Sequence, residues 1–511
     1  MLPRLALLAA VLLGGALAWP RLPDAVPATA PPGRFSAERA LVHVRAWSTA
    51  PRPTGSAAHA AVLDGAEAEL RRVGLNVVRE RFSLTTDSGP VDVVNLVAHA
   101  PGAPAPAPDA GGVWLTAHTD SVPESPGAAD DGLGLGVVME VARALAVDGV
   151  PPGLHVLLTD GEELGLYGAI GHARAAAAAG DAAPRLVLNV EARGTEGPAY
   201  MFQLAGPPAL LDAWRSAGCG AQATSLARAV YDVMPNDTDF TVFRRAGWWG
   251  YDFALLGGAW RYHTADDTPA NLSPRSVQQV GDCVLGLARS WLARPLDPAA
   301  APLDRVYFQA LGGTVVLPPW AVRALGAAAL LAFPWRHVGT WRVLVGVFAW
   351  GAALVAAGLA GAGLLAVAER VRPDLWDRPA EMVGPESWYL AAAALGLAVG
   401  AALARLGRAG VGWSLAGVLL AGAASLAAPT AGYVLVPGAW AAVLLARGRV
   451  DRALLPAFVA GMLVTPVLYA IYPALTTRTL PVLSVVPLLL AGWALGPVAP
   501  AVTPSRPSAA P

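Results

Sequence analysis

Long apolar runs with almost no charged side chains fill roughly the last 200 residues, and they constrain the fold more than any other feature. Seven segments can be separated, at roughly 317–334, 343–367, 388–403, 411–427, 430–446, 453–473 and 479–498. Most of the acids and arginines lie before residue 305. Only 14% of the chain is charged, whereas a globular domain is usually about a quarter charged. The sequence therefore predicts a water-soluble domain followed by an all-α polytopic membrane domain of about seven helices.

The short loops between these segments alternate in charge, which predicts the topology. Arginines follow the first, third and fifth segments and occur again in the tail: Arg336, Arg342, Arg405, Arg408, Arg447, Arg449, Arg452 and Arg506. Basic residues gather on the cytoplasmic side of a membrane. We therefore expect an integral membrane protein whose large soluble domain lies outside the cytoplasm. The apolar segments carry almost no ionisable residues, which favours anchoring in the lipid bilayer over transport.

The N-terminal segment allows two interpretations. Leu5–Trp19 is apolar but short for a spanning helix, and Ala16-Leu17-Ala18 resembles a signal-peptidase site. A membrane anchor and a cleaved signal both remain open. The predicted organisation is residues 1–20 as anchor or signal, 21–34 as a Pro/Ala-rich linker, 35–305 as the soluble domain, 306–500 as the membrane domain and 501–511 as a tail.

The composition indicates which partners and which kind of source organism can be expected for this protein. A net charge of −1 gives no reason to expect a nucleic-acid partner. The chain contains no lysine and is rich in Ala, Gly, Pro and Arg, which is typical of a GC-rich bacterial genome and suggests a bacterial cell membrane. Cys219 and Cys283 are too few for a cysteine-rich zinc module, although they could pair once in an oxidising compartment.

The soluble domain alternates strand and helix patterns. Its short, β-rich, mostly apolar runs are Val93–His99, Val113–Ala117, Leu154–Thr159 and Leu186–Val190, and its helical segments are Ser56–Val73, Gly132–Val147 and Leu166–Ala179. Nearly continuous hydrophobicity suits strands that are buried on both faces. The predicted fold class is α/β: a mixed, mostly parallel sheet sandwiched by helices.

Two motifs combine a histidine or acids with a predicted strand end. His118-x-Asp120 ends a β-rich run, where open α/β sheets place their sites, and Asp120 could accept the second imidazole N–H of His118. Asp130-Asp131 lies at a glycine-rich turn, where two adjacent carboxylates are unfavourable without a nearby cation. Taken singly, the first motif is compatible with a structural histidine and the second with a helix N-cap.

Three further motifs complete an ordered series. Glu162-Glu163 follows a strand, and such a pair lets one carboxylate bind a metal while its neighbour acts on water. Glu191 ends the next strand, and Tyr262-His263 adds a second histidine beside a phenol. None of the six other histidines has paired acids beside it: His43, His59, His99, His155, His172 and His337. The series predicts a metal-dependent hydrolase site.

In these motifs the sequence resembles the co-catalytic zinc aminopeptidases of metallopeptidase family 28, over roughly residues 90 to 290. The roles that the resemblance implies can be stated by residue: His118 and Glu191 bind one zinc, Glu163 and His263 bind the other, Asp130 bridges both, Glu162 is the catalytic base, Asp120 supports His118, and Tyr262 stabilises the oxyanion. The fold that it implies is zinc exopeptidase-like, with two Zn²⁺ per chain. Its substrate would be a peptide, hydrolysed by a water that Glu162 activates.

Glu191, where soluble aminopeptidases often have Asp, and the segment 236–240 (Asn-Asp-Thr-Asp-Phe) are similar to a membrane branch of that family. The branch contains the endoplasmic reticulum metallopeptidase and the vacuolar membrane protease, whose members usually have one more span. Three alternatives remain open: a single-zinc glutaminyl cyclase, a carboxypeptidase-like specificity, and a non-catalytic receptor-like relative.

Overall fold

The structure is a computed structural model in which the chain forms two compact units. One unit contains residues 20–304 and 312–314, and the other contains residues 1–19, 305–311 and those from 315 onward. The residues described are 2–86, 89–102, 112–180, 185–218, 220–232, 237–294, 303–335, 340–372, 386–406, 410–471 and 485–486.

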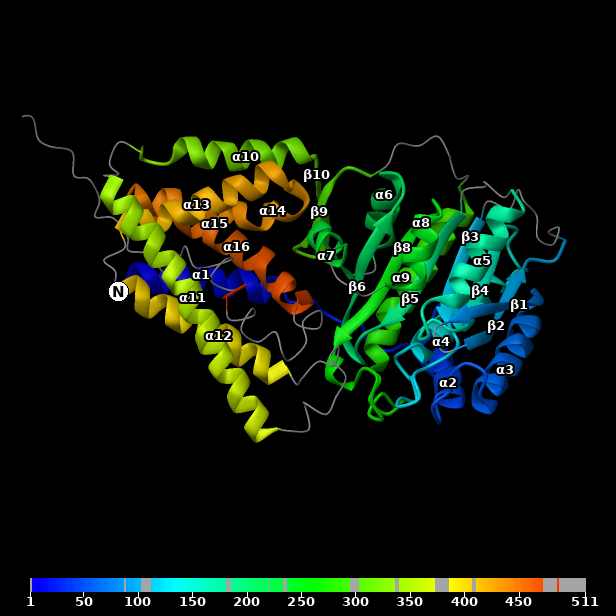
Figure 1. Ribbon diagram of the computed structural model, residues 1–511. Coiled ribbons are helices and arrows are strands. Elements are labelled where there is room, and N and C mark those ends of the chain that lie inside the picture. Colours follow the sequence, from blue (N-terminus) through cyan, green and yellow to red (C-terminus); the bar gives the residue numbers. More distant parts are fainter. Residues whose placement is uncertain are drawn as a thin grey trace, which may run out of the picture. The chain divides into compact units, whose positions relative to one another are not determined.

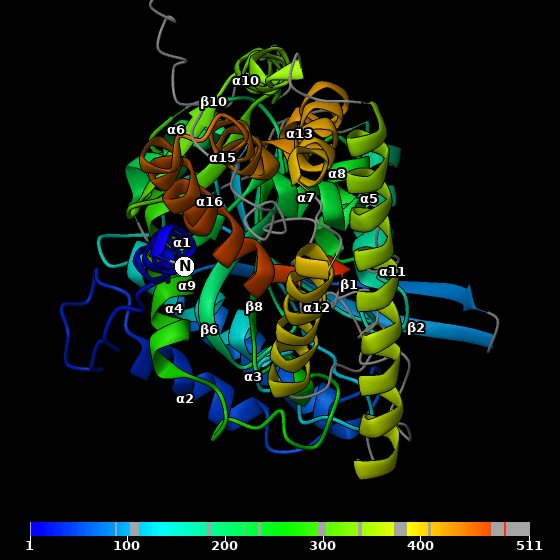
Figure 2. The ribbon, with the colours of Figure 1, turned by 90° about the vertical axis from the view of Figure 1, so that its left-hand side faces the viewer.

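The first unit is built on an eight-stranded sheet with the order β1-β2-β4-β3-β5-β8-β6-β7 (Figure 1). Its strands are β1 Asn76–Thr86, β2 Gly89–His99, β3 Gly112–His118, β4 Leu154–Thr159, β5 Arg185–Ala192, β6 Glu196–Ala205, β7 Gln222–Ala223 and β8 Trp249–Gly257. The four central strands, β4, β3, β5 and β8, run parallel. At one edge, β1 and β2 form a long antiparallel ribbon that is also visible in Figure 2.

Helices cover both faces of this sheet. They are α2 Ala37–Trp47, α3 Ala57–Val73, α4 Gly132–Leu145, α5 Tyr167–Ala178, α6 Ala209–Ala217, α7 Ser225–Tyr231, α8 Asp239–Arg245 and α9 Pro274–Leu292, with the 3-10 turn η1 Ala259–Arg261. Helices α4 and α9 pack on β3 and β5 on one face, while α5 and α8 lie on the other. The central strands are therefore buried on both sides, as β4 and β5 are along their whole length.

Local sequence explains where these elements begin and end. Ser56 caps α3 by accepting the main-chain N–H of His59, and Gly74 ends the helix in the left-handed conformation that glycine adopts without strain. The predicted α/β class is confirmed. The pattern did not indicate β1, β6 or β8, because β1 and β6 carry polar residues between their apolar ones, and β8 mixes glycine, aromatic and acidic residues.

The second unit is mainly helical. Its elements are α1 Leu2–Ala18, α10 Pro319–Ala332, α11 Thr340–Val371, α12 Glu386–Leu406, α13 Gly410–Ala427, α14 Pro429–Gly432, η4 Tyr433–Leu435, α15 Val436–Ala446 and α16 Val450–Ile471, and the strands β9 Val306–Ala310 and β10 Gly313–Leu317 form a hairpin before α10. Among the described residues, three helical segments are long and apolar enough to cross a membrane: 344–371, 429–446 and 450–467. Helices occupy six of the seven predicted apolar segments. The seventh, 479–498, lies outside the described residues except for 485–486.

Helix α1 lies along α16 (Figure 1). The two backbones approach so closely at two positions that only glycine fits there. A Cβ atom at Gly461 would overlap the main-chain oxygen of Val11, and one at Gly14 would overlap the main-chain oxygen of Phe458. Leu7 is buried in the apolar cluster that α10, α13, α15 and α16 share. Close backbone approach through small residues is how helices associate where the hydrophobic effect is weak. Helix α1 is thus part of the core of the helical unit.

We predict that Gly461→Leu destabilises the helical unit, because its side chain must push α1 and α16 apart, and overpacking of this kind costs about 1–3 kcal/mol. Gly351→Leu on α11 is the matched control, since a Cβ there meets no atom within 4 Å. Thermal unfolding of the detergent-solubilised chain should show a lower melting temperature for Gly461→Leu alone. Equal melting temperatures for the two variants would contradict the tight α1–α16 contact.

Candidate metal centre

Side chains from five separate segments meet at the carboxyl edge of the parallel strands. His118 ends β3 and Glu191 lies near the end of β5. Glu163 follows β4, Asp130 precedes α4, and His263 follows η1. Parallel strands end at the same edge of a sheet, and the loops that leave them therefore converge there. The structure brings together all five residues that the sequence predicts as metal ligands.

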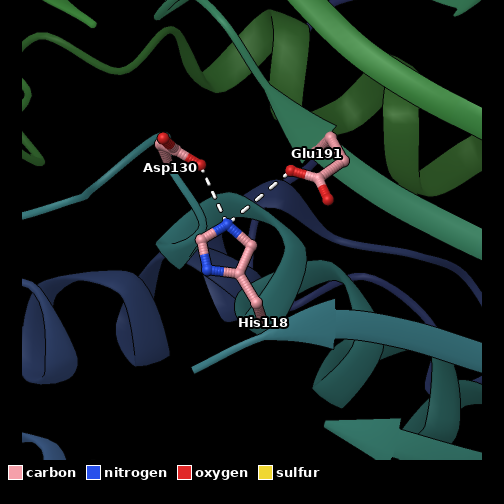
Figure 3. A group of neighbouring side chains, drawn as sticks. All are labelled: His118, Asp130 and Glu191. Atoms are coloured by element: carbon pink, nitrogen blue, oxygen red, sulfur yellow. Dashed lines mark hydrogen bonds and ion pairs between the residues drawn. The ribbon is translucent and has the colours of Figure 1, made fainter. Parts of the chain in front are cut away.

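The first group of donors forms around the imidazole of His118 (Figure 3). Its Nε2 atom lies 2.9 Å from Oδ1 of Asp130 and 3.6 Å from Oε2 of Glu191. All three side chains are buried. Figure 3 shows both carboxylates pointing toward the same ring nitrogen. One nitrogen and two carboxylate oxygens at this spacing could hold a metal ion.

The second group forms around His263 and includes the same aspartate. The Nε2 atom of His263 lies 3.1 Å from Oδ2 of Asp130 and 3.1 Å from Oε2 of Glu163. The two oxygens of Asp130 thus face different histidines. His263 has a φ angle of 56°, which is uncommon for a residue with a side chain. The group Asp130, Glu163 and His263 could hold a second metal ion beside the first.

Burial and crowded charge govern the electrostatics of the site. Burial, followed by repulsion from neighbouring carboxylates, raises the pKa of Glu163 and raises that of Glu191 well above its usual value. Burial lowers the pKa of His263, but hydrogen bonds to Asp130 and Glu163 outweigh it and raise that pKa to about 10. His118 shifts in the same direction, since Asp120 and Asp130 outweigh its burial and raise its pKa. The carboxylates therefore favour positive charge at the centre of the site.

The donor set fits a divalent metal ion such as zinc. Imidazole nitrogens and carboxylate oxygens are normal zinc ligands. Oε1 of Glu163 is buried and has no hydrogen-bond partner among the described residues. A buried carboxylate oxygen of this kind is unfavourable unless a cation or water meets it. Glu162, like Glu163, follows β4, and it forms a further group of possible metal ligands with His118 and Glu163. Zinc would be held by these residues.

Asp120 lies beside the imidazole of His118 and also contacts the segment that follows β4. Nδ1 of His118 lies 3.2 Å from the main-chain oxygen of Asp120 and 3.5 Å from its carboxylate. The carboxylate accepts hydrogen bonds from the main-chain N–H groups of Glu162 and Glu163, both at 3.2 Å. Asp120 therefore joins the histidine of β3 to the two glutamates that follow β4.

Tyr262 lies against the second histidine. Its ring stacks on that of His263, with 3.6 Å between the ring centroids, and the guanidinium of Arg193 lies 4.9 Å from the centre of the Tyr262 ring. Burial, followed by the negative charge of Asp130, raises the pKa of the Tyr262 phenol well above its usual value. The phenol therefore keeps its proton and can donate a hydrogen bond.

Comparison with known proteins identifies the family of this domain. Residues 95–288 match the family model described as peptidase family M28. We call the unit that carries this match the M28 domain. Over 218 residues it is 32% identical to human endoplasmic reticulum metallopeptidase 1, a match that covers 40% of this chain and 24% of the relative. Over 233 residues it is 27% identical to the vacuolar membrane protease of Candida albicans, covering 43% and 25%. The predicted family and its membrane branch are confirmed, and the chain matches about a quarter of the length of these relatives.

Solved structures also align with the M28 domain. Glutaminyl cyclase of Porphyromonas gingivalis is 23% identical with a TM-score of 0.41, and the alignment covers 50% of this chain and 98% of that structure. A leucine aminopeptidase precursor of Bacteroides thetaiotaomicron is 18% identical with a TM-score of 0.41, covering 50% and 97%.

Asp267 supports the M28 site in a way that sequence reasoning missed. Its carboxylate accepts the main-chain N–H of Ala129 at 2.7 Å and that of Asp130 at 3.1 Å. It therefore fixes the backbone on which Asp130 stands, immediately before the cis peptide bond between Asp130 and Asp131. In the sequence, the only indication of this role was that Asp267 stands four residues after His263, beside the exposed Asp266.

We predict that Asp267→Asn destabilises the M28 domain by about 1–3 kcal/mol, since an amide offers one acceptor oxygen to two buried N–H groups. Asp266→Asn is the neighbouring control, because Asp266 is exposed and should change stability by no more than about 0.5 kcal/mol. Denaturant unfolding of the full chain in the presence of a chelator removes any contribution from metal affinity. If both variants unfold like the wild type, Asp267 does not hold this loop.

Proposed function

We propose that this protein is a membrane-anchored, zinc-dependent exopeptidase with aminopeptidase specificity. The observation that carries the proposal is the position of Asp130, whose two carboxylate oxygens face two different histidines. Membership of residues 95–288 in peptidase family M28 supports peptide hydrolysis. The names of the similar proteins, endoplasmic reticulum metallopeptidase 1 and vacuolar membrane protease, agree with a membrane-bound peptidase.

The proposed centre holds two zinc ions per chain. One ion would be held by His118 and Glu191 and the other by Glu163 and His263, and Asp130 would contribute a carboxylate oxygen to each. The two donor groups support this division because Asp130 belongs to both. Zinc in such a pair acts as a Lewis acid that lowers the pKa of water and polarises a carbonyl group.

Residues of the chain itself transfer the proton and stabilise the negative charge that develops during hydrolysis. Glu162 accepts a proton from the attacking water and then delivers it to the nitrogen of the leaving amine. Tyr262 donates its phenol O–H to the oxygen on which negative charge develops. Asp120 holds the main-chain N–H groups of Glu162 and Glu163, so the base and its neighbouring ligand keep a fixed relation.

The peptidase domain is proposed to lie outside the cytoplasm, with α1 retained as a membrane anchor. The alternation of arginine-rich loops supports this orientation. Cys283 on α9 is disulfide-bonded, which suits an oxidising compartment, and the chain's other cysteine, Cys219, lies outside the described residues. The close contact of Gly14 and Gly461 with main-chain atoms of the facing helix favours a retained α1 over a cleaved signal.

We expect Glu162→Gln to retain its zinc and to hydrolyse peptides about 10²–10⁴-fold more slowly, because the amide cannot accept the proton. Glu124→Gln, an exposed glutamate on the loop between His118 and Asp130, is the control and should turn over normally. Zinc content and peptide hydrolysis are measured on the same preparations. Substantial turnover by Glu162→Gln would disprove the base assignment, and lost zinc would make Glu162 a ligand instead.

The zinc count and the cleavage pattern separate the proposed activity from its alternatives. Elemental analysis of the full chain should find two zinc ions, and peptides with a blocked carboxyl terminus should be cleaved while amino-blocked peptides are not. The reverse cleavage pattern would indicate a carboxypeptidase. One tightly bound zinc together with cyclisation of N-terminal glutaminyl peptides would indicate a cyclase, and the absence of any turnover would indicate a receptor-like relative.

A further inference from the structure

Arg52 is a fully buried arginine that contacts the loop between His118 and Asp130. Its relative exposure is 0%, and it belongs to the segment between α2 and α3, far in sequence from every proposed ligand. Arginine is among the residues least often buried, because removing its charge from water is costly unless that charge is compensated. A residue of this kind at this place calls for a specific reason.

The guanidinium binds both ends of the loop that joins His118 to Asp130. Nε donates to the main-chain oxygen of Thr119 at 2.9 Å, immediately after His118. Nη1 donates to the oxygen of Pro126, and Nη2 to that of Gly127 at 3.0 Å, three residues before Asp130. The rigid fork of one guanidinium thus fixes the spacing of two loop ends.

The backbone of Arg52 strengthens this attachment at the middle of the loop. Its N–H donates to Oγ of Ser121 at 3.0 Å, and its carbonyl oxygen accepts the N–H of Ser121 at 3.3 Å. Ser48 adds a hydroxyl that donates to the oxygen of Gly127 at 3.2 Å. Gly127 itself has a φ angle of 62°, and a Cβ there would lie 2.9 Å from Nη1 of Arg52. Guanidinium and loop are therefore fitted to each other.

The charge of Arg52 also suits its surroundings. Burial lowers its pKa, and the carboxylates of Asp131, Asp267, Asp120 and Asp130 act in the opposite direction. These four acids lie in or beside the loop and the metal centre. Because they crowd negative charge into a buried region, a fixed positive charge near them stabilises the arrangement. A neutral side chain could replace some of the hydrogen bonds but not this charge.

We propose that Arg52 is a positioning residue of the metal centre: by fixing the loop between His118 and Asp130, it sets the distance between ligands and so the affinity for metal. The inference rests on the proposed function, from which it takes its set of ligands. The experiment that tests it measures metal binding rather than hydrolysis. Residues that orient metal ligands from behind usually change metal affinity about 10–100-fold when they are replaced.

Arg39 provides a matched control within the same domain. Its guanidinium also donates to several main-chain oxygens, those of Ala28, Ala30 and Arg34, and it pairs with the buried Glu140. These contacts hold the segment before α2 and do not involve the loop that carries Asp130. Replacement of Arg39 by lysine reports the general cost of losing an arginine fork.

The test compares Arg52→Lys with Arg39→Lys in the detergent-solubilised full chain. Zn²⁺ affinity is measured by competition with a chelating dye, and the absorption spectrum after Co²⁺ substitution reports ligand geometry. We expect Arg52→Lys to bind Zn²⁺ about 10–100-fold more weakly with an altered Co²⁺ spectrum, and Arg39→Lys to match the wild type in both. Equal affinities and spectra for the wild type and Arg52→Lys, or equal losses in the two variants, would overturn the proposal.

Ser48→Ala keeps the proposal testable if Arg52→Lys does not fold. It removes the hydroxyl on Gly127 without introducing a charge change, and it should weaken Zn²⁺ binding in the same direction by a smaller factor. Unchanged Zn²⁺ affinity in Ser48→Ala, with Arg52→Lys unfolded, would count against the proposal. A wild type that binds two Zn²⁺ without cleaving any peptide would disprove the proposed function and leave the role of Arg52 to be decided by affinity alone.

Discussion

The M28 domain depends on holding several buried carboxylates close together around one aspartate. Oδ1 of Asp130 lies 2.9 Å from His118 and Oδ2 lies 3.1 Å from His263. Like charges at short range are unfavourable where the effective dielectric constant is low. The architecture meets this difficulty with imidazoles, with main-chain N–H groups directed at Asp120 and Asp267, and with a place for metal cations. The hydrogen bonds around this edge of the sheet keep these groups in fixed positions relative to one another.

The parallel centre of the sheet explains why residues so distant in sequence can share one site. Strands β4, β3, β5 and β8 end at the same edge, and the site is built from residues at the ends of strands and in the loops that follow them. Side-chain hydrogen bonds also hold polar residues of β5 and β8 near this edge. The side-chain amide of Asn189 donates to Oε1 of Glu191 at 3.3 Å and to Oδ1 of Asp252 at 2.9 Å. A site assembled in this way relies on strand register, because a shift of one residue would turn a ligand to the opposite face.

The fold class could be predicted from the sequence, and the five residues proposed as metal ligands do lie close together, because both follow from local patterns. Apolar runs give strands, and acids or histidines directly after those runs give candidate ligands. It could not predict Asp267 or Arg52, since their importance comes from hydrogen bonds to backbone atoms far away in the chain. The additional partners of the Asp120 carboxylate could not be predicted either, because spacing alone cannot show that the amides of Glu162 and Glu163 lie within its reach.

A carboxylate shared by two groups of donors has an evolutionary consequence. Any replacement of Asp130 alters both groups at once, because asparagine supplies one acceptor oxygen and glutamate adds a methylene group to a side chain that fits between two imidazoles. His118 and Glu163 also belong to two groups each, so a change at either of them likewise affects more than one group. If the proposed function holds, one codon change at position 130 is enough for a gene duplicate to lose metal binding while its sheet and helices persist.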